Sequence, residues 1–248
     1  MKIVRFTHEG QTQAGILSGS KITAVFSPFD TRETGSEFEL DDVQLEVPVE
    51  PRKVICVGLN FADHAAEINQ EPPKEPLFFF KPTSSLVASG KEIVLPAQSQ
   101  QVEIEVELAI VIGKTAKNIE PADASSVVLG FTIANDVTAR DLQFQDLQWA
   151  RSKAFDTFCP LGPWIETDFD PGTKRLRSRI NGELRQDSLT DQMVYGPWEL
   201  ISYISKNLTL EPGDVILTGS PSGISKIVSG DRVECEIEGI GTLTNIVT

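Results

Sequence analysis

The chain has 248 residues, of which 40% are hydrophobic and 23% charged, an ordinary composition for a soluble globular protein. A formal net charge of −14 argues against a nucleic-acid partner and against an anionic membrane surface, since both call for clustered Lys and Arg. Cys56, Cys159 and Cys235 are an odd and scattered set, which disfavours a disulfide framework. The first residues lack the apolar core of a signal peptide and no apolar run approaches transmembrane length, so we expect a cytoplasmic protein.

The N-terminal region has a composition of its own. Residues 1–26 carry short apolar patches separated by turn residues, and this pattern predicts a small antiparallel β-meander. Residues 27–46 are polar and acidic, and we expect a connection or a short helix there. The composition changes near residue 47, which divides the chain into an N-terminal β-subdomain (residues 1–46) and a main domain (residues 47–248).

The main domain reads as strands with few helices. It opens with a buried strand over residues 53–58, and a helix follows over residues 60–69 with Asn60 as a possible N-cap. Asn181–Gly182, between strand-like flanks, is a hairpin signal. Apolar residues at helical spacing predict a second helix over residues 198–207, and glycine-punctuated strands end the chain. The predicted fold class is therefore α+β and strand-dominated.

Residues 101–113, QVEIEVELAIVIG, combine a strict alternation with three carboxylates. Successive side chains of a strand point to opposite faces, so Glu103, Glu105 and Glu107 share one face and the apolar residues share the other. Three like charges in a row repel one another, and a bound cation would remove that cost. A solvated outer face of an antiparallel sheet is the alternative and the commoner case.

A second acidic segment has the sequence ANDVTARD. Asp136 directly follows an apolar strand predicted over residues 126–135, a plausible position for an active-site residue. A hard divalent cation such as Mg²⁺ or Mn²⁺ prefers oxygen ligands, and Glu105, Glu107 and Asp136 would supply them if the fold brings the strand ends together. Asp141 could serve equally, or could cap the turn that follows.

The chain has two histidines, and one of them has a carboxylate partner. His8 is expected in an exposed loop of the N-terminal meander. His64 precedes Glu67 by three residues, so the two side chains would be neighbours on one face of a helix. A His–carboxylate pair suits the activation of water, and an incidental surface pair is the alternative.

Two later segments carry weaker signals. Arg151 and Lys153 precede an aromatic loop rich in Gly and Pro, and they suggest either recognition of an anionic substrate or a surface pair of cations. Residues 217–223, LTGSPSG, follow a strand and offer backbone donors and hydroxyls. They resemble an anion-binding nest but lack the Gly-Lys-Ser/Thr element of a P-loop.

Together these segments resemble the fumarylacetoacetate hydrolase family, in particular its bacterial acylpyruvate hydrolase and 2-hydroxyhepta-2,4-diene-1,7-dioate isomerase-like members. The resemblance covers residues 47–248, and residues 1–46 resemble the small N-terminal β-subdomain of bacterial members. It runs in the family's order through GLNFADHAAE, FFKPTSS, EVELAIVIG, ANDVTARDLQ, WARSKAFDTFCPLGP, NGELRQ and EPGDVILTGSPSG. The implied fold is a mixed β-sheet roll with few helices, and the implied assembly is a homodimer.

The resemblance also implies a role for each candidate residue. It assigns the metal ligands to Glu105, Glu107 and Asp136, catalysis to His64, Glu67 and Lys153, and substrate binding to Lys81, Arg140, Gln143 and Thr218. The helix that carries His64 is often a lid in the family. The implied cofactor is Mg²⁺ or Mn²⁺, and the implied partner is a small anionic 2-oxo acid.

The first activity that the resemblance implies is hydrolysis of the C–C bond of an acylpyruvate-type 2,4-dioxo acid through a metal-bound enolate. Decarboxylation of an oxaloacetate-like 2-oxo acid, or isomerisation of a hydroxymuconate-derived diene-dioate, would use the same site because each needs the same enolate stabilisation. A catalytically silent binding protein of the same fold is the third alternative, and the complete set of candidate residues argues against it.

Overall fold

The computed structural model describes residues 1–248, and strands dominate it. Its largest sheet has twelve strands. Ten of them run in the order β4 (Asp30–Glu39), β3 (Lys21–Ser27), β2 (Gln11–Ser18), β1 (Lys2–His8), β14 (Cys159–Glu166), β12 (Val128–Asn135), β11 (Val106–Ile112), β17 (Val215–Leu217), β6 (Val54–Gly58) and β7 (Leu77–Lys81). Beside this path, β5 (Gln44–Leu45) pairs with β1 and β8 (Leu86–Val87) pairs with β14.

Two smaller sheets complete the β-structure. The five-stranded sheet has the order β16 (Glu183–Leu189), β15 (Arg175–Ile180), β19 (Arg232–Ile237), β20 (Gly241–Val247) and β9 (Glu92–Ile93). The three-stranded sheet has the order β13 (Thr138–Ala139), β10 (Val102–Ile104) and β18 (Ser225–Lys226). Strands β15 and β16 form the hairpin predicted at Asn181–Gly182, and both turn residues have the positive φ angles that an Asn-Gly turn requires.

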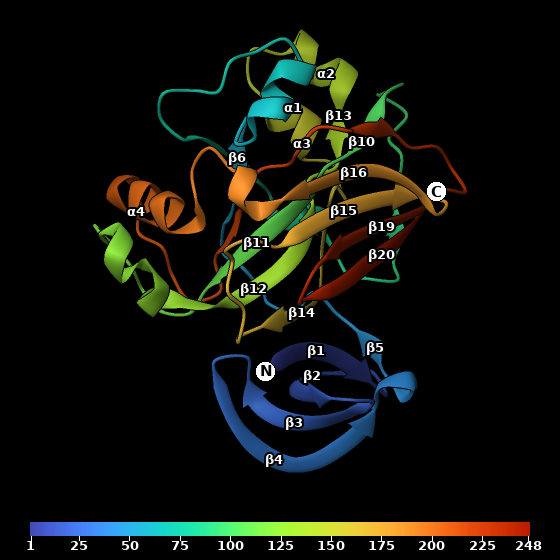
Figure 1. The fold of residues 1–248 in the computed structure, drawn as a ribbon. Coiled ribbons are helices and arrows are strands. Elements are labelled where there is room, and N and C mark those ends of the chain that lie inside the picture. Colours follow the sequence, from blue (N-terminus) through green and yellow to red (C-terminus); the bar gives the residue numbers. More distant parts are fainter.

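The helices are few and short. They are α1 (Ala62–Glu67), α2 (Arg140–Gln145), α3 (Ala150–Lys153) and α4 (Pro197–Asn207), with 3-10 turns η1 (Leu40–Asp42), η2 (Thr83–Ser85), η3 (Pro121–Val127) and η4 (Thr190–Gln192). Helix α4 confirms the predicted helix near the C-terminus. Figure 1 shows α1, α2 and α3 gathered at one end of the molecule beside β10 and β13, with strands β1–β5 as a lobe at the other end. No helix has the length and apolar character needed to span a membrane.

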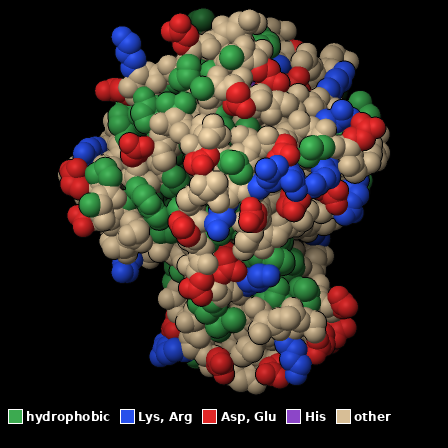
Figure 2. Space-filling model, in the orientation of Figure 1, with side chains coloured by type: hydrophobic (Ala, Val, Ile, Leu, Met, Phe, Trp, Pro, Cys, Tyr) green, Lys and Arg blue, Asp and Glu red, His purple; other side chains and the backbone are tan.

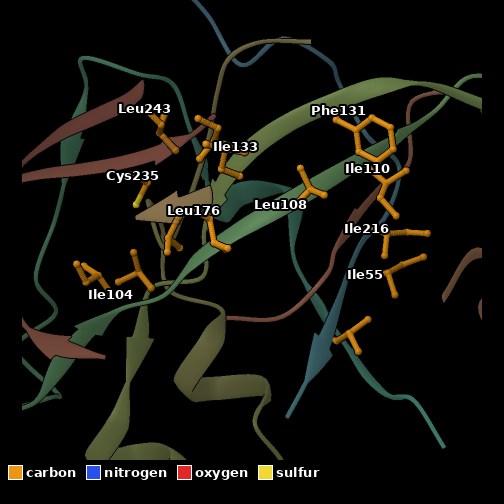
Figure 3. Close-up of a cluster of buried hydrophobic side chains, with 14 of the residues drawn as sticks. Ile55, Ile104, Leu108, Ile110, Phe131, Ile133, Leu176, Ile216, Cys235 and Leu243 are labelled. Carbon is orange, nitrogen blue, oxygen red and sulfur yellow. The ribbon is translucent and has the colours of Figure 1, made fainter. Parts of the chain in front are cut away.

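The main core lies between the large sheet and the five-stranded sheet. Figure 3 shows Leu108, Ile133, Leu176 and Leu243 from the two sheets directed toward one another. A second cluster covers the other face of the large sheet, so β11 is buried on both faces and its sequence is apolar from Leu108 onward. Burial on both faces holds β11, the strand that carries Glu107, firmly in place.

Acidic and basic side chains are interspersed on the face of the molecule that Figure 2 shows. Figure 2 shows acidic groups on both lobes, with basic side chains grouped over the β15–β16 hairpin. Those basic groups are ion-paired, for example Arg175 and Arg177 with Asp187 and Arg179 with Glu236. Basic side chains therefore group locally although the net charge of the chain is −14.

The prediction for residues 27–46 was wrong. The first three strands of the meander are present, but residues 30–39 form a fourth strand, β4, rather than a connection or a short helix. This strand is the edge of the sheet and most of its side chains are exposed, so its sequence lacks the alternation that marks a half-buried strand. The domain boundary near residue 47 stays a prediction; strand β1 pairs with β14 across it, with Ile3 opposite Ile165.

The expectation of one continuous strand over residues 101–113 was also wrong. The chain breaks at Glu105 into β10 and β11, which belong to different sheets. The Asn135 side-chain Oδ1 accepts a hydrogen bond from the Glu105 amide at 3.0 Å, and the Asp136 amide donates to the Glu105 carbonyl at 2.9 Å. Side-chain and local backbone bonds thus replace the ladder at the break. The break turns Glu105 toward Asp136 instead of leaving it in a strand face.

Candidate active site

Three carboxylates meet where β11 begins and β12 ends. Glu105 lies at the break between β10 and β11, Glu107 lies on β11, and Asp136 directly follows β12. One oxygen atom from each lies within 4.8 Å of the others, and the three residues are 4%, 1% and 1% exposed. The alternative of a solvated outer face is excluded. An all-oxygen, all-carboxylate set with this spacing fits a hard divalent cation.

Three cations surround these carboxylates. The Lys81 ammonium donates to Asp136 Oδ1 at 2.5 Å and to the Val137 carbonyl at 3.1 Å. The Lys153 ammonium donates to Glu105 Oε2 at 3.0 Å and to the second oxygen of Asp136. Each lysine therefore fixes the orientation of at least one candidate metal ligand.

Arg140 connects the third glutamate of the alternating segment to the same site. Its Nε donates to Glu103 Oε2 at 2.7 Å, and one of its terminal nitrogens donates to Glu105 Oε1. Glu103 thus pairs with Arg140 and is not one of the candidate metal ligands. With Glu103 counted, four buried carboxylates face three buried cations, so a bound divalent cation would meet an excess of negative charge.

The local charges move the pKa values of the glutamates in opposite directions. Burial raises the pKa of Glu105, but the Lys153 ammonium and the Arg140 guanidinium outweigh it and hold that pKa well below its ordinary value. Burial raises the pKa of Glu107 well above its ordinary value, and the neighbouring Asp136 and Glu105 add to the effect. Glu107 has one compensating contact, the Gly219 amide donating to Oε2 at 2.6 Å. The raised pKa of Glu107 shows that a fourth negative charge is unfavourable in this site, and a bound divalent cation would relieve that cost.

Helix α1 brings the predicted His–carboxylate pair to this site. His64 is buried, and its Nδ1 lies 3.2 Å from Glu67 Oε2. The helix is held to the loop after β17 by two contacts: Ser222 Oγ donates to Asp63 Oδ2 at 2.8 Å, and the Gly223 amide donates to Glu67 Oε1 at 3.0 Å. The pair is therefore part of the site rather than an incidental surface pair.

Asn60 is not the N-cap of α1. Phe61 occupies that position, and the Asn60 amide instead donates to the Thr218 carbonyl at 2.7 Å and to the Tyr195 carbonyl at 2.9 Å. Asn60 can make these two long-range bonds because it is buried against segments that are far away in the sequence. The prediction was wrong because a sequence pattern shows only the local partners of an Asn side chain.

The side chains enclose a cavity of about 20 Å³, room for one water molecule. The carboxylate triad, His64, Arg140, Gln143, Lys153 and Ser220 form its polar side. Its apolar side is formed by Val57, Gly58, Leu59, Ile68, Phe79 and Trp149. The Trp149 ring lies so close to Gly58 that a Cβ there would be 2.6 Å from it, so only glycine fits beneath this ring.

The other predicted site residues are divided between the cavity and its support. Gln143 borders the cavity and accepts a hydrogen bond from Arg140. Lys81 and Thr218 do not line it; Thr218 Oγ1 donates to the Leu108 carbonyl at 2.9 Å and so ties the loop to β11. Their contacts support the ligand-bearing strands rather than the cavity surface.

Two acidic or basic candidates lie outside the site. Asp141 accepts hydrogen bonds from Ser99 Oγ at 2.6 Å and from the Gln100 amide at 2.8 Å, so it is neither a member of the triad nor the cap of α2, whose N-cap position is Ala139. These bonds outweigh burial and lower the pKa of Asp141. Arg151 is exposed and paired with Asp146, so of the two cations in its segment only Lys153 reaches the carboxylates.

Three residues of the cavity were given no site role from the sequence: Ser220, which belongs to the predicted nest, and the aromatic residues Trp149 and Phe79. The two rings pack edge to face, with centroids 5.4 Å apart. The Lys153 ammonium lies 5.2 Å from the Phe79 ring centroid. A lysine four residues after a tryptophan, which places both on one side of a helical turn, was the available clue.

The fold is a strand-dominated roll. Its site combines a buried carboxylate triad, two lysines paired with that triad, and a short helix that carries His64 and Glu67. This combination is typical of an enzyme with a buried metal site. Residues 53–248 match the family described as Fumarylacetoacetate (FAA) hydrolase C-terminal. Residues 1–48 match the family described as Rv2993c-like, N-terminal. The chain belongs to the fumarylacetoacetate hydrolase family, and its fold is the one that the sequence resemblance predicted.

Relatives of known activity catalyse different reactions. The chain is 48% identical to the human mitochondrial oxaloacetate tautomerase FAHD2A over 209 residues, which cover 79% of the chain and 67% of the tautomerase. A 5-carboxymethyl-2-hydroxymuconate delta-isomerase from Mycobacterium smegmatis has a TM-score of 0.94 and 42% identity, covering 100% and 99% of the two chains. A maleylpyruvate hydrolase from Sphingobium sp. SYK-6, in complex with manganese (II) ion and pyruvate, has a TM-score of 0.84, 31% identity and the same coverage. Members of the family are thus isomerases, hydrolases and tautomerases.

Proposed function

We propose that this protein is a divalent-metal-dependent hydrolase that cleaves the C–C bond of an acylpyruvate-type 2,4-dioxo acid. The observation that carries the proposal is that His64, with Glu67 at 3.2 Å, borders the same closed cavity as the carboxylate triad and Lys153. Hydrolysis needs a base for water beside an electrophilic centre, and a metal-bound substrate in this cavity would lie beside His64.

Glu105, Glu107 and Asp136 would hold the metal, and Mg²⁺ and Mn²⁺ suit this donor set best. When bound, the ion supplies Lewis-acid polarisation of the oxygens of a 2-oxo acid. Lys81 and Lys153 keep Asp136 and Glu105 in their orientations. The Mn(II) and pyruvate bound to the maleylpyruvate hydrolase support both the ion and the substrate class.

The remaining steps belong to side chains of the chain itself. His64 takes a proton from a water molecule in the cavity, and Glu67 stabilises the charge that develops on its ring. The Lys153 ammonium stabilises the negative charge that develops on the carbonyl oxygen when the water attacks the carbonyl carbon. The C–C bond then breaks to release the acid, and the proton held by His64 passes to the enolate carbon to give pyruvate. Arg140 and Gln143 orient the anionic end of the substrate from the polar side of the cavity.

The second candidate is tautomerisation or decarboxylation of an oxaloacetate-like acid. The observation that favours it is the 48% identity to the human oxaloacetate tautomerase FAHD2A. Isomerisation of a diene-dioate has the support of the 42% identical isomerase structure. Proton transfer by His64 would serve each of these reactions without attack by water.

A substrate panel with products identified by mass separates these reactions. The purified protein with Mg²⁺ or Mn²⁺ is given acetylpyruvate, fumarylpyruvate, oxaloacetate and a diene-dioate, with Glu105→Ala/Glu107→Ala as the control variant. Pyruvate plus a free acid from acetylpyruvate or fumarylpyruvate supports the proposal. Loss of CO₂ from oxaloacetate, or an ultraviolet shift without cleavage, would support the second candidate function instead. Turnover no faster than that of the control variant would contradict metal-dependent catalysis altogether.

A further inference from the structure

Gln186 is a fully buried side chain whose hydrogen bonds join three separate segments. It lies on β16, outside the cavity and outside the carboxylate triad. Its Oε1 accepts from the Val106 amide at 3.0 Å and from Ser178 Oγ at 2.8 Å. Its Nε2 donates to Ser220 Oγ at 2.8 Å and to the Pro221 carbonyl at 2.7 Å. A side-chain amide has two donors and two acceptor positions, so all four are used.

The oxygen end of this amide serves the strand break beside Glu105. The Val106 amide lies immediately after the break, where β10 and β11 part into different sheets. Gln186 accepts from that amide, while Asn135 accepts from the Glu105 amide one residue earlier. These two side chains satisfy the buried backbone donors that the broken ladder leaves. The oxygen end therefore helps to set the direction of Glu105 relative to Glu107.

The nitrogen end serves the loop over residues 218–223. In this loop the Gly219 amide donates to Glu107, and the Gly223 amide donates to Glu67 on helix α1. The loop lies directly on β16, because a Cβ at Gly223 would be 2.2 Å from the Arg185 carbonyl oxygen. The position of the loop thus determines where α1 and His64 stand above the carboxylates.

We propose that Gln186 is a positioning residue that holds the carboxylate strand and the loop under α1 at one fixed spacing. The proposal rests on the proposed function only in that the triad binds a divalent cation. Its consequence is that ion binding and closure of α1 are coupled through one amide, since a shift at Val106 moves the loop that carries the contact to Glu67.

Gln186→Met tests this, because methionine has a similar length and makes none of the four bonds. Mn²⁺ affinity is measured by calorimetry, and amide hydrogen exchange is measured at residues 219–223 and 62–68. We expect affinity to fall about tenfold, as for other residues that orient metal ligands, and exchange at both segments to become faster. Ser178→Ala is the matched control: it removes a buried hydroxyl bonded to the same Oε1, and we expect Mn²⁺ affinity within about twofold of wild type.

A folded Gln186→Met variant with wild-type Mn²⁺ affinity and wild-type exchange at both segments would overturn the proposal. If that variant does not fold, Gln186→Asn keeps the amide but is one methylene too short to reach both partners, and the same losses are expected. The wild-type protein gives an independent test. Mn²⁺ should slow exchange at residues 62–68 as well as 102–112, and protection confined to 102–112 would contradict the coupling. Mn²⁺ binding without turnover of any 2-oxo acid would defeat the proposed hydrolysis and leave this inference standing.

Discussion

Lys153 illustrates how a single side chain serves both the fold and the chemistry of this site. Its ammonium bridges Glu105 and Asp136, and it lies at the end of α3 with Trp149 four residues before it. Burial lowers its pKa, but Asp136 and Glu105 outweigh that effect and raise the pKa above its ordinary value. Lys153 therefore stays charged and can stabilise an oxyanion.

Lys153→Met separates the two roles. Without the ammonium, we expect turnover to fall at least about 100-fold, because the charge that faces the substrate oxygen is lost. Mn²⁺ affinity should be kept or should increase, since the ion becomes the main group relieving repulsion among the carboxylates. Steady-state kinetics and calorimetry on the same preparation check both parts. A parallel fall of Mn²⁺ affinity and turnover would show that Lys153 acts only by shaping the metal ligands.

Helix α1 is too short to be stable without tertiary contacts. It has six residues and no side-chain N-cap, and its contacts with the loop are the bonds to Ser222 and Gly223. The cavity beneath it has room for one water molecule, so a substrate can enter only after part of the lining has moved, and His64 places α1 in that lining. We therefore expect the contacts of α1 to influence access to the site.

Ser222→Ala removes the bond to Asp63 without touching the cavity. We expect the closed state to lose about 1 kcal/mol, roughly a fivefold shift toward open forms, because the bond is charge-assisted but exposed. Amide exchange at residues 62–68 should rise by that factor, while the melting temperature should fall by no more than about 2–4 °C. Ser126→Ala is the control, since Ser126 makes an exposed bond of similar length far from the site. Equal exchange at residues 62–68 in the two variants would refute the role of Ser222.

The sequence predicted the elements whose signal is local, and it failed where partners are distant. Asn181–Gly182 carries its own turn chemistry, and α4 its own apolar spacing. Alternation located Glu105 and Glu107, but the break at Glu105 depends on Asn135 and, through the adjacent Val106 amide, on Gln186. Those contacts join segments 30 and 80 residues apart. Strand β4 was missed because an exposed edge strand imposes no pattern on its residues.

The N-terminal lobe contacts the rest of the molecule through the pairing of β1 with β14 and through nearby side chains, among them the ion pair between the Met1 amino group and Glu166. Strand β1 pairs with β14, Ile3 packs in the same buried cluster as Ile165, and the Lys2 ammonium lies 4.3 Å from the Trp164 ring centroid. The lobe also has a small core of its own, formed by Val4, Phe6, Leu17 and Ile22. Strand β14, which carries no candidate site residue, would lose its pairing with β1 at Ile165 and Glu166 if the lobe were removed, and would keep its pairing with β8.

A chain lacking residues 1–46 tests whether the proposed subdomains are independent. Exposure of Ile165 and loss of Ile3 remove about 2–4 kcal/mol of apolar burial, so we expect the melting temperature to fall by at least about 5 °C. The free β14 edge should also promote association at higher concentrations. Calorimetry and light scattering check both effects. A truncated chain that keeps the oligomeric state of the full chain and melts within about 1 °C of it would show that the lobe does not support the main domain.

The central claim is that Glu105, Glu107 and Asp136 form a divalent metal centre, and calorimetric titration with Mn²⁺ tests it most directly. Glu103→Gln and Glu107→Gln are a matched pair, because both glutamates are buried and lie close together in the chain but only Glu107 belongs to the triad. We predict that the wild-type chain binds one Mn²⁺, that Glu103→Gln still binds it, and that Glu107→Gln loses at least about tenfold in affinity. No binding by the wild-type chain, or equal losses in the two variants, would contradict the metal centre.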